Sequence, residues 1–274
     1  MATNDFESRE IDPRVPSAAR LYHYYLTGEP VFDADKLFAE RVFARFSHLD
    51  TWAHHNREFL GRAARFMVEQ GIRQFLDIGS GLPTGGNTHD IARESAPDAR
   101  VVYVDNDLEA VNRAHDLLLQ QHALDTTAIV EADLRHPDAI LDHADTRRLI
   151  DFDQPVGLLI VSVWPFVAES ERPLELMARL RDRLPSGSYA AMAHVSLEDV
   201  GTEIQRQMAS AAELYDETSD PVTLRSRAQF AALFDGFELV EPGIVYAPDW
   251  RPDLAVDVDH PARPCNFAAV GYMP

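Results

Sequence analysis

The chain has 274 residues, 46% of them hydrophobic, which is enough for a substantial core and excludes a disordered protein. Its 25 basic and 45 acidic residues give a formal charge of −20, which opposes binding to phosphate backbones, so we expect no nucleic-acid partner. With one cysteine, Cys265, no apolar leader and no run of about 18 apolar residues, the sequence predicts a soluble, cytoplasmic protein that is not bound to membranes.

The first 50 or so residues contain several prolines and a cluster of aromatic residues, and no strand-like pattern. We expect this part to be irregular or helical, and we assign residues 1–55 to an N-terminal lid or arm. From Asn56 the apolar positions follow helical spacing as far as Gly71, which is a natural end for a helix. A second domain, residues 56–274, is therefore expected to hold the regular elements.

Strand and helix patterns alternate from residue 73 onward. The run "PVGLLIVSV" is continuously apolar, as is typical of a central parallel strand. Predicted helices lie near residues 84–95, 108–118, 172–183, 203–214 and 226–234, and a further one is opened by "HPDAIL" at residue 136. The predicted strands of the alternating part are "RQFLDI", "RVVYVD", "TAIVEAD", "PVGLLIVSV" and "GSYAAMAHV".

The end of the chain breaks this alternation, because "FELVEPGIVY" and "CNFAAVGYM" are two strand patterns with no helix between them. Such a connection suits an antiparallel pair. Together the patterns predict an α/β fold with a seven-stranded, mostly parallel sheet and an antiparallel C-terminal strand. This layout resembles the Rossmann-like fold of class I S-adenosylmethionine methyltransferases, although a fold alone does not assign a function.

The segment "LDIGSGLPTGG", residues 76–86, follows the first predicted strand. Glycines at such a position let the backbone turn sharply and approach a ligand. A dinucleotide fingerprint would need a third glycine where Thr84 stands, and a P-loop would need Gly-Lys-Ser/Thr, which is absent. The segment therefore favours a different adenosine cofactor.

Three aspartates, Asp77, Asp105 and Asp133, end three consecutive predicted strands. The carboxyl ends of parallel strands open into one crevice, so these side chains are expected to meet there. Asp105 could accept hydrogen bonds from ribose hydroxyls, Asp133 from an adenine amino group, and Asp77 could orient a cationic methionine end. Alternatively, Asp105 and Asp133 only cap the helices that follow.

Several strings resemble a bacterial S-adenosylmethionine-dependent methyltransferase family first catalogued as a domain of unknown function. They include "FLDIGSGLPT", "VVYVDND", "ADLRHPDAIL" and the opening "PSAARLYHYYLTG". The resemblance spans nearly the whole chain and implies the class I fold with S-adenosyl-L-methionine as cofactor. By the pattern of the class, the implied cofactor contacts are Asp77, Gly79, Ser80 and Gly81 for the methionine portion, Asp105 for the ribose, and Asn106, Asp133 and Leu134 for the adenine.

The fourth predicted strand ends in "VSVWPFV", which lacks the Asp/Asn-Pro-Pro-aromatic motif of many amino-group methyltransferases and the acid of metal-dependent ones. We expect Trp164 and Phe166 to form an aromatic lip for a small organic acceptor, without a metal. Ordinary packing of these aromatic side chains is the alternative. His194, His89 and Tyr22 are the candidate catalytic groups, and either histidine could instead be structural.

The N-terminal string "PSAARLYHYYLTG" combines aromatic residues with one arginine. Arg20, Tyr22 and Tyr25 could close over the cofactor and contact the acceptor as a lid, or serve as a packing or dimer arm. The sequence leaves the oligomeric state open. It favours a methyltransferase acting on a small molecule over a non-catalytic nucleoside-binding regulator and over a nicotinamide-dependent oxidoreductase.

Overall fold

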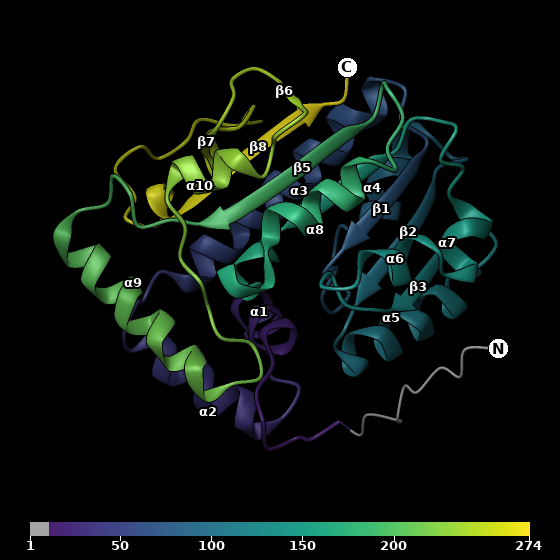
Figure 1. Cartoon of the computed structure of the whole chain (residues 1–274). Helices are drawn as coiled ribbons and strands as arrows, with labels where there is room; N and C mark the ends of the chain where they lie inside the picture. The colour runs from purple at the N-terminus through teal and green to yellow at the C-terminus, as the bar shows by residue number, and fades with distance from the viewer. Residues whose placement is uncertain (1–10) are drawn as a thin grey trace.

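The computed structural model describes residues 11–274, and its centre is a mixed sheet of eight strands (Figure 1). Successive side chains of a strand point to opposite faces, so the strands supply two separate cores. Leu76 packs in one core and its neighbour Phe75 in the other. The strands are β1 (Gln74–Ile78), β2 (Arg100–Asp105), β3 (Thr127–Glu131), β4 (Gly157–Val161), β5 (Tyr189–Val195), β6 (Glu238–Leu239), β7 (Val245–Tyr246) and β8 (Asn266–Tyr272).

Helices cover both faces of this sheet (Figure 1). They are α1 (Ala18–Thr27), α2 (Asp33–Phe43), α3 (Leu49–Glu69), α4 (Thr88–Ser95), α5 (Leu108–Gln120), α6 (Pro137–Leu141), α7 (Ala144–Leu149), α8 (Pro173–Arg181), α9 (Thr202–Leu214) and α10 (Arg227–Ala232). The core with Leu76 is closed by α6, α7, α8 and α10, and the core with Phe75 by α3 and α4. Within residues 11–274, none of the helices combines the length and apolar character needed to cross a bilayer.

The strand order is β3-β2-β1-β4-β5-β8-β6, and β7 also pairs with β8. The first five strands are parallel, and β8 runs antiparallel to β5. From β1 the chain builds the sheet outward through β2 and β3, and then returns to the other side of β1 with β4. A ligand crevice forms at such a reversal, beyond the carboxyl ends of the strands.

The strand count differs from the seven that the sequence predicts. "FELVEPGIVY" is not one strand: it forms β6 and β7, which pair with different parts of β8. The interruption contains Pro242, which has no N–H to donate to a ladder, and Gly243, whose φ of 80° turns the chain.

Two helix starts also differ from expectation. The predicted helix at 84–95 begins only at Thr88, because Gly86 has a φ of 71° and Asn87 provides the N-cap, paired with Asp90. The helix expected from Asn56 begins at Leu49. The proposed boundary at residues 55 and 56 therefore falls inside α3, and residues 1–10 of the N-terminal segment lie outside the described part.

The N-terminal segment, expected to be irregular or helical, forms α1 and α2. A third hydrophobic cluster joins Leu21 of α1, Phe38 of α2 and Met208 of α9. In Figure 1 these three helices gather beyond the carboxyl ends of the parallel strands. The three strand-end aspartates lie at the same edge of the sheet, where the strands β1, β2 and β3 end.

Candidate functional site

A cavity of about 520 Å³ lies at this edge, and we call it the central cavity. Its size is within the range of about 300 to 1,000 Å³ that small-molecule sites occupy. Its wall contains residues at the carboxyl ends of β1, β2, β3 and β4, together with residues of α1 and α3. All eight residues that the sequence assigns to the cofactor line it: Asp77, Gly79, Ser80, Gly81, Asp105, Asn106, Asp133 and Leu134.

The glycine loop after β1 bends toward β2. The backbone N–H groups of Gly79 and Ser80 donate to the carbonyl oxygen of Val104, at 2.7 and 3.2 Å. Gly79 has a φ of 71°, and a Cβ there would collide with the side chain of Val163 after β4. Only glycine fits this close approach of two strand ends.

Ser80 Oγ is buried and has no hydrogen-bond partner among the described residues, although Ser80 lines the central cavity. The same holds for Nε of Arg57, which enters from α3. Buried polar atoms normally find partners, so the two atoms mark polar binding capacity at the cavity wall.

Asp105 is 5% exposed and ends β2. Burial raises the pKa of its carboxyl to about 7, against hydrogen bonds from the backbone of Asp107 and Gly81, which favour the charged form. Each carboxylate oxygen accepts one of these bonds, at 2.9 and 2.7 Å. An ionised oxygen can accept further bonds, so the group can also hold two ligand hydroxyls.

Asp77 lines the cavity and accepts a hydrogen bond of 2.6 Å from Thr88 Oγ1. Burial raises the pKa of its carboxyl to about 6, while the Thr88 bond and the charge of Arg57 act in the opposite direction. A buried carboxylate favours a cationic neighbour, and a ligand's ammonium or sulfonium would supply one.

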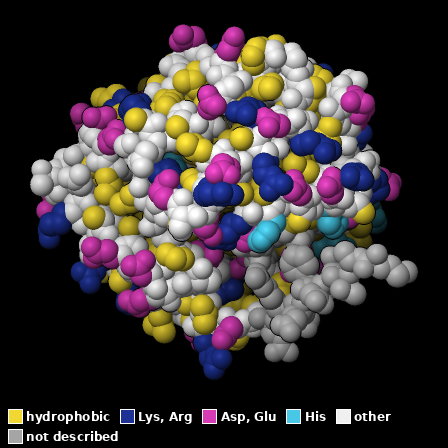
Figure 2. Space-filling model, in the orientation of Figure 1, with side chains coloured by type: hydrophobic (Ala, Val, Ile, Leu, Met, Phe, Trp, Pro, Cys, Tyr) yellow, Lys and Arg dark blue, Asp and Glu magenta, His cyan; other side chains and the backbone are white. Residues whose placement is uncertain are grey.

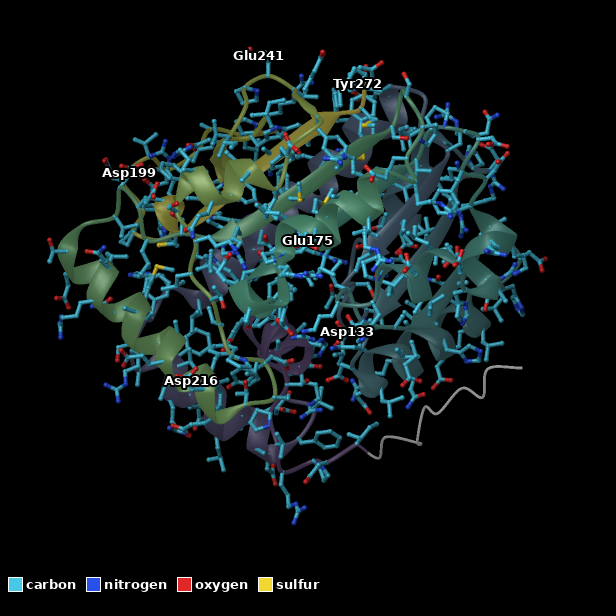
Figure 3. All side chains as sticks on the ribbon, viewed as in Figure 1. Asp133, Glu175, Asp199, Asp216, Glu241 and Tyr272 are labelled. Atoms are coloured by element: carbon cyan, nitrogen blue, oxygen red, sulfur yellow. The ribbon has the colours of Figure 1, made fainter. Side chains whose placement is uncertain are left out.

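Asp133 follows β3 and lies toward the middle of the molecule in Figure 3, whereas Glu241 lies at its upper margin. Its Oδ1 accepts from the backbone N–H of Arg135 at 2.8 Å, and its Oδ2 from Asn106 Nδ2 at 3.0 Å. The bond from the Arg135 backbone and the Arg135 charge outweigh burial, so the pKa of Asp133 is lowered. Its carboxylate therefore stays ionised and fixes Asn106 at the cavity wall.

Four aromatic residues also line the central cavity, and we call the part of the wall that they form its aromatic half. Tyr22 of α1 and Trp52 of α3 meet edge to face with ring centroids 6.2 Å apart, and Phe166 and Tyr215 form a tilted pair at 6.2 Å. Aromatic walls of this kind bind apolar or cationic organic groups.

Trp164 and His194 do not belong to the cavity wall in the described chain. Trp164 is fully buried in the core, where its Nε1 donates to Sδ of Met192 at 3.2 Å. His194 is also fully buried, and its Nδ1 donates to the carbonyl oxygen of Val195 while its Nε2 accepts from Arg225. Both ring nitrogens therefore have structural contacts. Burial lowers the pKa of His194 to about 3, so the side chain remains neutral.

His89 lines a smaller neighbouring cavity of about 20 Å³. Its ring nitrogens bond Tyr103 Oη at 2.7 Å and Gln121 Oε1 at 2.8 Å, and burial lowers its pKa. These contacts join α4 to β2 and to the C-cap residue of α5.

Arg20 and Tyr25 of α1 are 4% and 3% exposed, and Tyr25 belongs to the hydrophobic cluster of the N-terminal helices. Arg20 Nε pairs with the buried carboxylate of Asp35 at 3.0 Å, and Tyr25 Oη bonds Tyr215 Oη at 2.8 Å. Of the candidates on α1, only Tyr22 lines the central cavity.

The structure adds residues that the sequence did not single out. Trp52, Tyr215 and Asp220 line the cavity, and Asp220 Oδ2 accepts from the backbone N–H of Ala18 at 3.0 Å. Ser17 Oγ donates to the carboxylate of Asp107, which also caps α5. Asp107 stands in the motif "VVYVDND", but residues 215–220 carry no pattern that places them here.

A sequence model of the family described as S-adenosyl methyltransferase matches residues 4–274. The chain belongs to this S-adenosyl methyltransferase family. A comparison with curated proteins found no match.

Two similar solved structures cover almost all of the methyltransferase. A putative methyltransferase from Thermobifida fusca YX is 35% identical, with a TM-score of 0.87, over 95% of this chain and 96% of that chain. A DUF574 family protein from Streptomyces avermitilis MA-4680 is 36% identical, with a TM-score of 0.86, over 97% of this chain and all of the other. The fold alone is shared with the methyltransferase SibL, at 17% identity and a TM-score of 0.51 over 95% of this chain and 64% of that chain.

These matches confirm the class I fold, the methyltransferase activity and S-adenosyl-L-methionine as the cofactor that the sequence predicts. The chemistry of the cavity wall fits this cofactor, because buried carboxylates suit its ammonium and sulfonium groups. Ser80 Oγ and Arg57 Nε, which have no partner among the described residues, could bond its polar groups. Among residues 11–274, no three or more His, Cys, Asp or Glu side chains form a group that could hold a metal ion.

Proposed function

We propose that the methyltransferase modifies a small organic acceptor, which enters the aromatic half of the central cavity while the three aspartates hold the cofactor. The observation that carries this proposal is that one cavity contains both Asp105 and the rings of Tyr22 and Phe166. A donor and an acceptor bound in a shared cavity can be aligned for direct transfer.

The cofactor half would be held by the residues that end the first three strands. Asp105 would accept from the ribose hydroxyls, Asn106, Asp133 and Leu134 would contact the adenine, and Asp77 would attract the ammonium. The glycine loop would let the backbone approach the methionine portion, with Ser80 Oγ and Arg57 as polar contacts. All of these residues line the cavity, which supports the assignment.

The cofactor supplies an activated methyl group on a sulfonium. The chain's own contribution is alignment and the exclusion of water, since such a displacement needs little acid or base chemistry. The helix α1 and the segment that carries Tyr215 and Asp220 line the cavity and would keep water out. His194 and His89, the histidines considered as bases, have both ring nitrogens in structural hydrogen bonds.

The charge of the chain supports a small acceptor over a nucleic acid. On the face in Figure 2, Lys and Arg side chains alternate with Asp and Glu, and the net charge is −20. A nucleic-acid partner would require a continuous basic surface. The single cysteine, Cys265, is buried, which supports our proposal of a reducing, cytoplasmic location.

Calorimetry with S-adenosylhomocysteine tests the site. Asp105→Ala should weaken binding by about 1.5 to 3 kcal/mol if the carboxylate holds the ribose through charged hydrogen bonds. Asp116→Ala, which removes an exposed carboxylate from α5, is the matched control and should bind normally. Unchanged affinity in a folded Asp105→Ala protein would refute the ribose assignment, and preferential binding of NAD would refute the cofactor site.

A further inference from the structure

The phenol proton of Tyr22 is already used in a hydrogen bond within the protein. Tyr22 Oη donates to the carbonyl oxygen of Ala53 at 3.0 Å, and a carbonyl can only accept. The same oxygen accepts from Nδ2 of Asn56 at 3.0 Å. A phenol oxygen has one further acceptor site, so what Tyr22 can offer an additional partner is a lone pair and not a proton.

The hydroxyl of Ser162, at the carboxyl end of β4, is committed in the same way. Ser162 Oγ donates to Oδ1 of Asn56 at 2.8 Å, and this amide oxygen also accepts from Asn266 Nδ2 at 2.9 Å. Two donors at Oδ1 fix the orientation of the Asn56 amide, whose Nδ2 then faces Tyr22. Tyr22, Asn56 and Ser162 all line the central cavity.

Ser162 adopts a backbone conformation that is costly for a residue with a side chain. Its φ is 59°, and its N–H is held by the carbonyl oxygen of Ala193 in β5 at 3.0 Å. Such conformations are unfavourable for residues with a side chain, and they cluster at sites of function. The strain is consistent with a hydroxyl that must stand at this position of the cavity.

From these contacts we propose that the methyl acceptor is a primary amine, bound through its N–H groups by the oxygens of Tyr22 and Ser162. We call these two oxygens the acceptor pair. The inference rests on the proposed function, because it assigns the group that enters the aromatic half of the same cavity. An amine with two N–H donors satisfies both oxygens and keeps its lone pair for the methyl group.

Other acceptors match the acceptor pair less well. A hydroxyl carries one proton and can satisfy only one of the two oxygens, and a carboxylate or ether carries none. A hydroxyl would also need a base, whereas both candidate histidines are held in structural contacts. The aromatic pairs of Tyr22 with Trp52 and Phe166 with Tyr215 suit the organic body of an amine.

The transfer balances without a further reactant. The amine loses a proton to water and arrives as the free base. Its nitrogen lone pair forms the new N–C bond to the methyl carbon, and the C–S bond breaks with its electron pair going to sulfur. The methylated ammonium then releases a second proton to water.

A matched series of ligands tests the acceptor pair by binding. Protein saturated with S-adenosylhomocysteine is titrated with 2-phenylethylamine, its N-methyl and N,N-dimethyl derivatives, and 2-phenylethanol. The charge is the same along the amine series while the number of N–H donors falls, so we expect affinity to fall from the primary to the tertiary amine. The alcohol, with one donor, should bind less tightly than the primary amine.

Tyr22→Phe and Ser162→Ala each remove one oxygen of the pair. Each should weaken binding of 2-phenylethylamine by roughly 3- to 10-fold, the effect of one hydrogen bond, and should flatten the difference between the primary and tertiary amines. Affinity for S-adenosylhomocysteine should not change. Tyr189→Phe is the control, because Tyr189 begins β5 at the opposite edge of the sheet. The two variants lie on different elements, so a folding defect in one leaves the other decisive.

A transfer assay identifies the attacked atom. The enzyme is supplied with methyl-¹³C S-adenosylmethionine and a mixture of primary amines, alcohols and carboxylic acids, and the chemical shift of the transferred methyl is measured. An N-methyl product is expected. An O-, S- or C-methyl product, or equal binding along the amine series, overturns the inference while S-adenosylhomocysteine still binds. Failure to bind S-adenosylhomocysteine would overturn the proposed function as well.

Discussion

The backbone N–H of Gly81 donates a hydrogen bond of 2.7 Å to Oδ2 of Asp105. This bond joins the glycine loop after β1 to the end of β2, so the loop and the strand end are one structural unit. Asp105 therefore has two tasks: it shapes the loop and it supplies a carboxylate to the cavity. The bond also explains why Gly81, with a φ of 67°, holds a conformation that favours glycine.

Glycine substitutions should separate backbone strain from steric collision. Gly79 and Gly81 both have positive φ, but only at Gly79 would a Cβ collide with Val163. We expect Gly81→Ala to lower the free energy of unfolding by about 1 to 2 kcal/mol and Gly79→Ala by about 2 to 4 kcal/mol. Chemical denaturation without ligand measures both.

Gly85→Ala is the control for this pair, because Gly85 has no positive φ and open space around its Cβ position. It should leave stability nearly unchanged. Equal losses at Gly79 and Gly81 would mean that Val163 moves aside and that the close approach is not enforced.

Cofactor binding should depend on pH. Burial raises the pKa of Asp77 to about 6 and that of Asp105 to about 7, so in this range the free folded protein carries more protons than the unfolded chain. The stability that these carboxyls contribute is present at low pH and lost as the pH rises through 6 and 7. A cationic, hydrogen-bond-donating ligand needs the ionised forms.

Affinity for S-adenosylmethionine should therefore increase at least about tenfold from about pH 5 to about pH 8, with proton release on binding near pH 6. Calorimetry in two buffers of different ionisation enthalpy counts the protons. The Asp105→Ala protein should release fewer protons on binding than the unaltered protein. Proton uptake, or affinity that is independent of pH, would contradict the assignment of these two carboxyls.

The buried pair of Arg20 and Asp35 should hold α1 against α2. Removing one partner leaves an uncompensated buried charge, so Arg20→Ala should lower the free energy of unfolding by about 3 to 5 kcal/mol. The double variant with Asp35→Ala should lose less than the sum of the single variants. Breaking the exposed pair of Arg41 and Glu217 is the control and should change stability little. Additive losses at Arg20 and Asp35 would show that the pair does not act as a unit.

His194 should matter for stability and not for cofactor binding. His194→Ala removes two hydrogen bonds and leaves a buried cavity, so we expect a loss of about 2 to 4 kcal/mol in denaturation experiments. Affinity for S-adenosylhomocysteine should stay within about twofold. His115→Ala, on the exposed side of α5, controls for the loss of a histidine. A stable His194→Ala protein that binds the cofactor poorly would contradict the structural assignment.

The sequence by itself determined the alternation of strands and helices along most of the chain from β1 onward, and which residues stand at the strand ends. Apolar runs fix where a strand ends, and parallel strands open their carboxyl ends at one edge. Asp77, Asp105 and Asp133 could therefore be assigned to one cavity from their positions alone, and all three line it. The glycine loop could also be predicted from the sequence, because the spacing of glycines reflects local backbone geometry.

Only the tertiary structure decided the rest of the site. A position near a strand end does not tell whether a side chain faces the cavity or the core: Trp164 and His194 pack inward, against Met192 and Arg225, while Ser162 lines the cavity. Asn56 of α3 bonds Tyr22, and it also bonds Ser162 after β4 and Asn266 of β8. These elements lie far apart in the sequence. Hydrogen bonds between distant elements leave no periodic signal in the sequence, because they depend on how helices pack and not on local spacing.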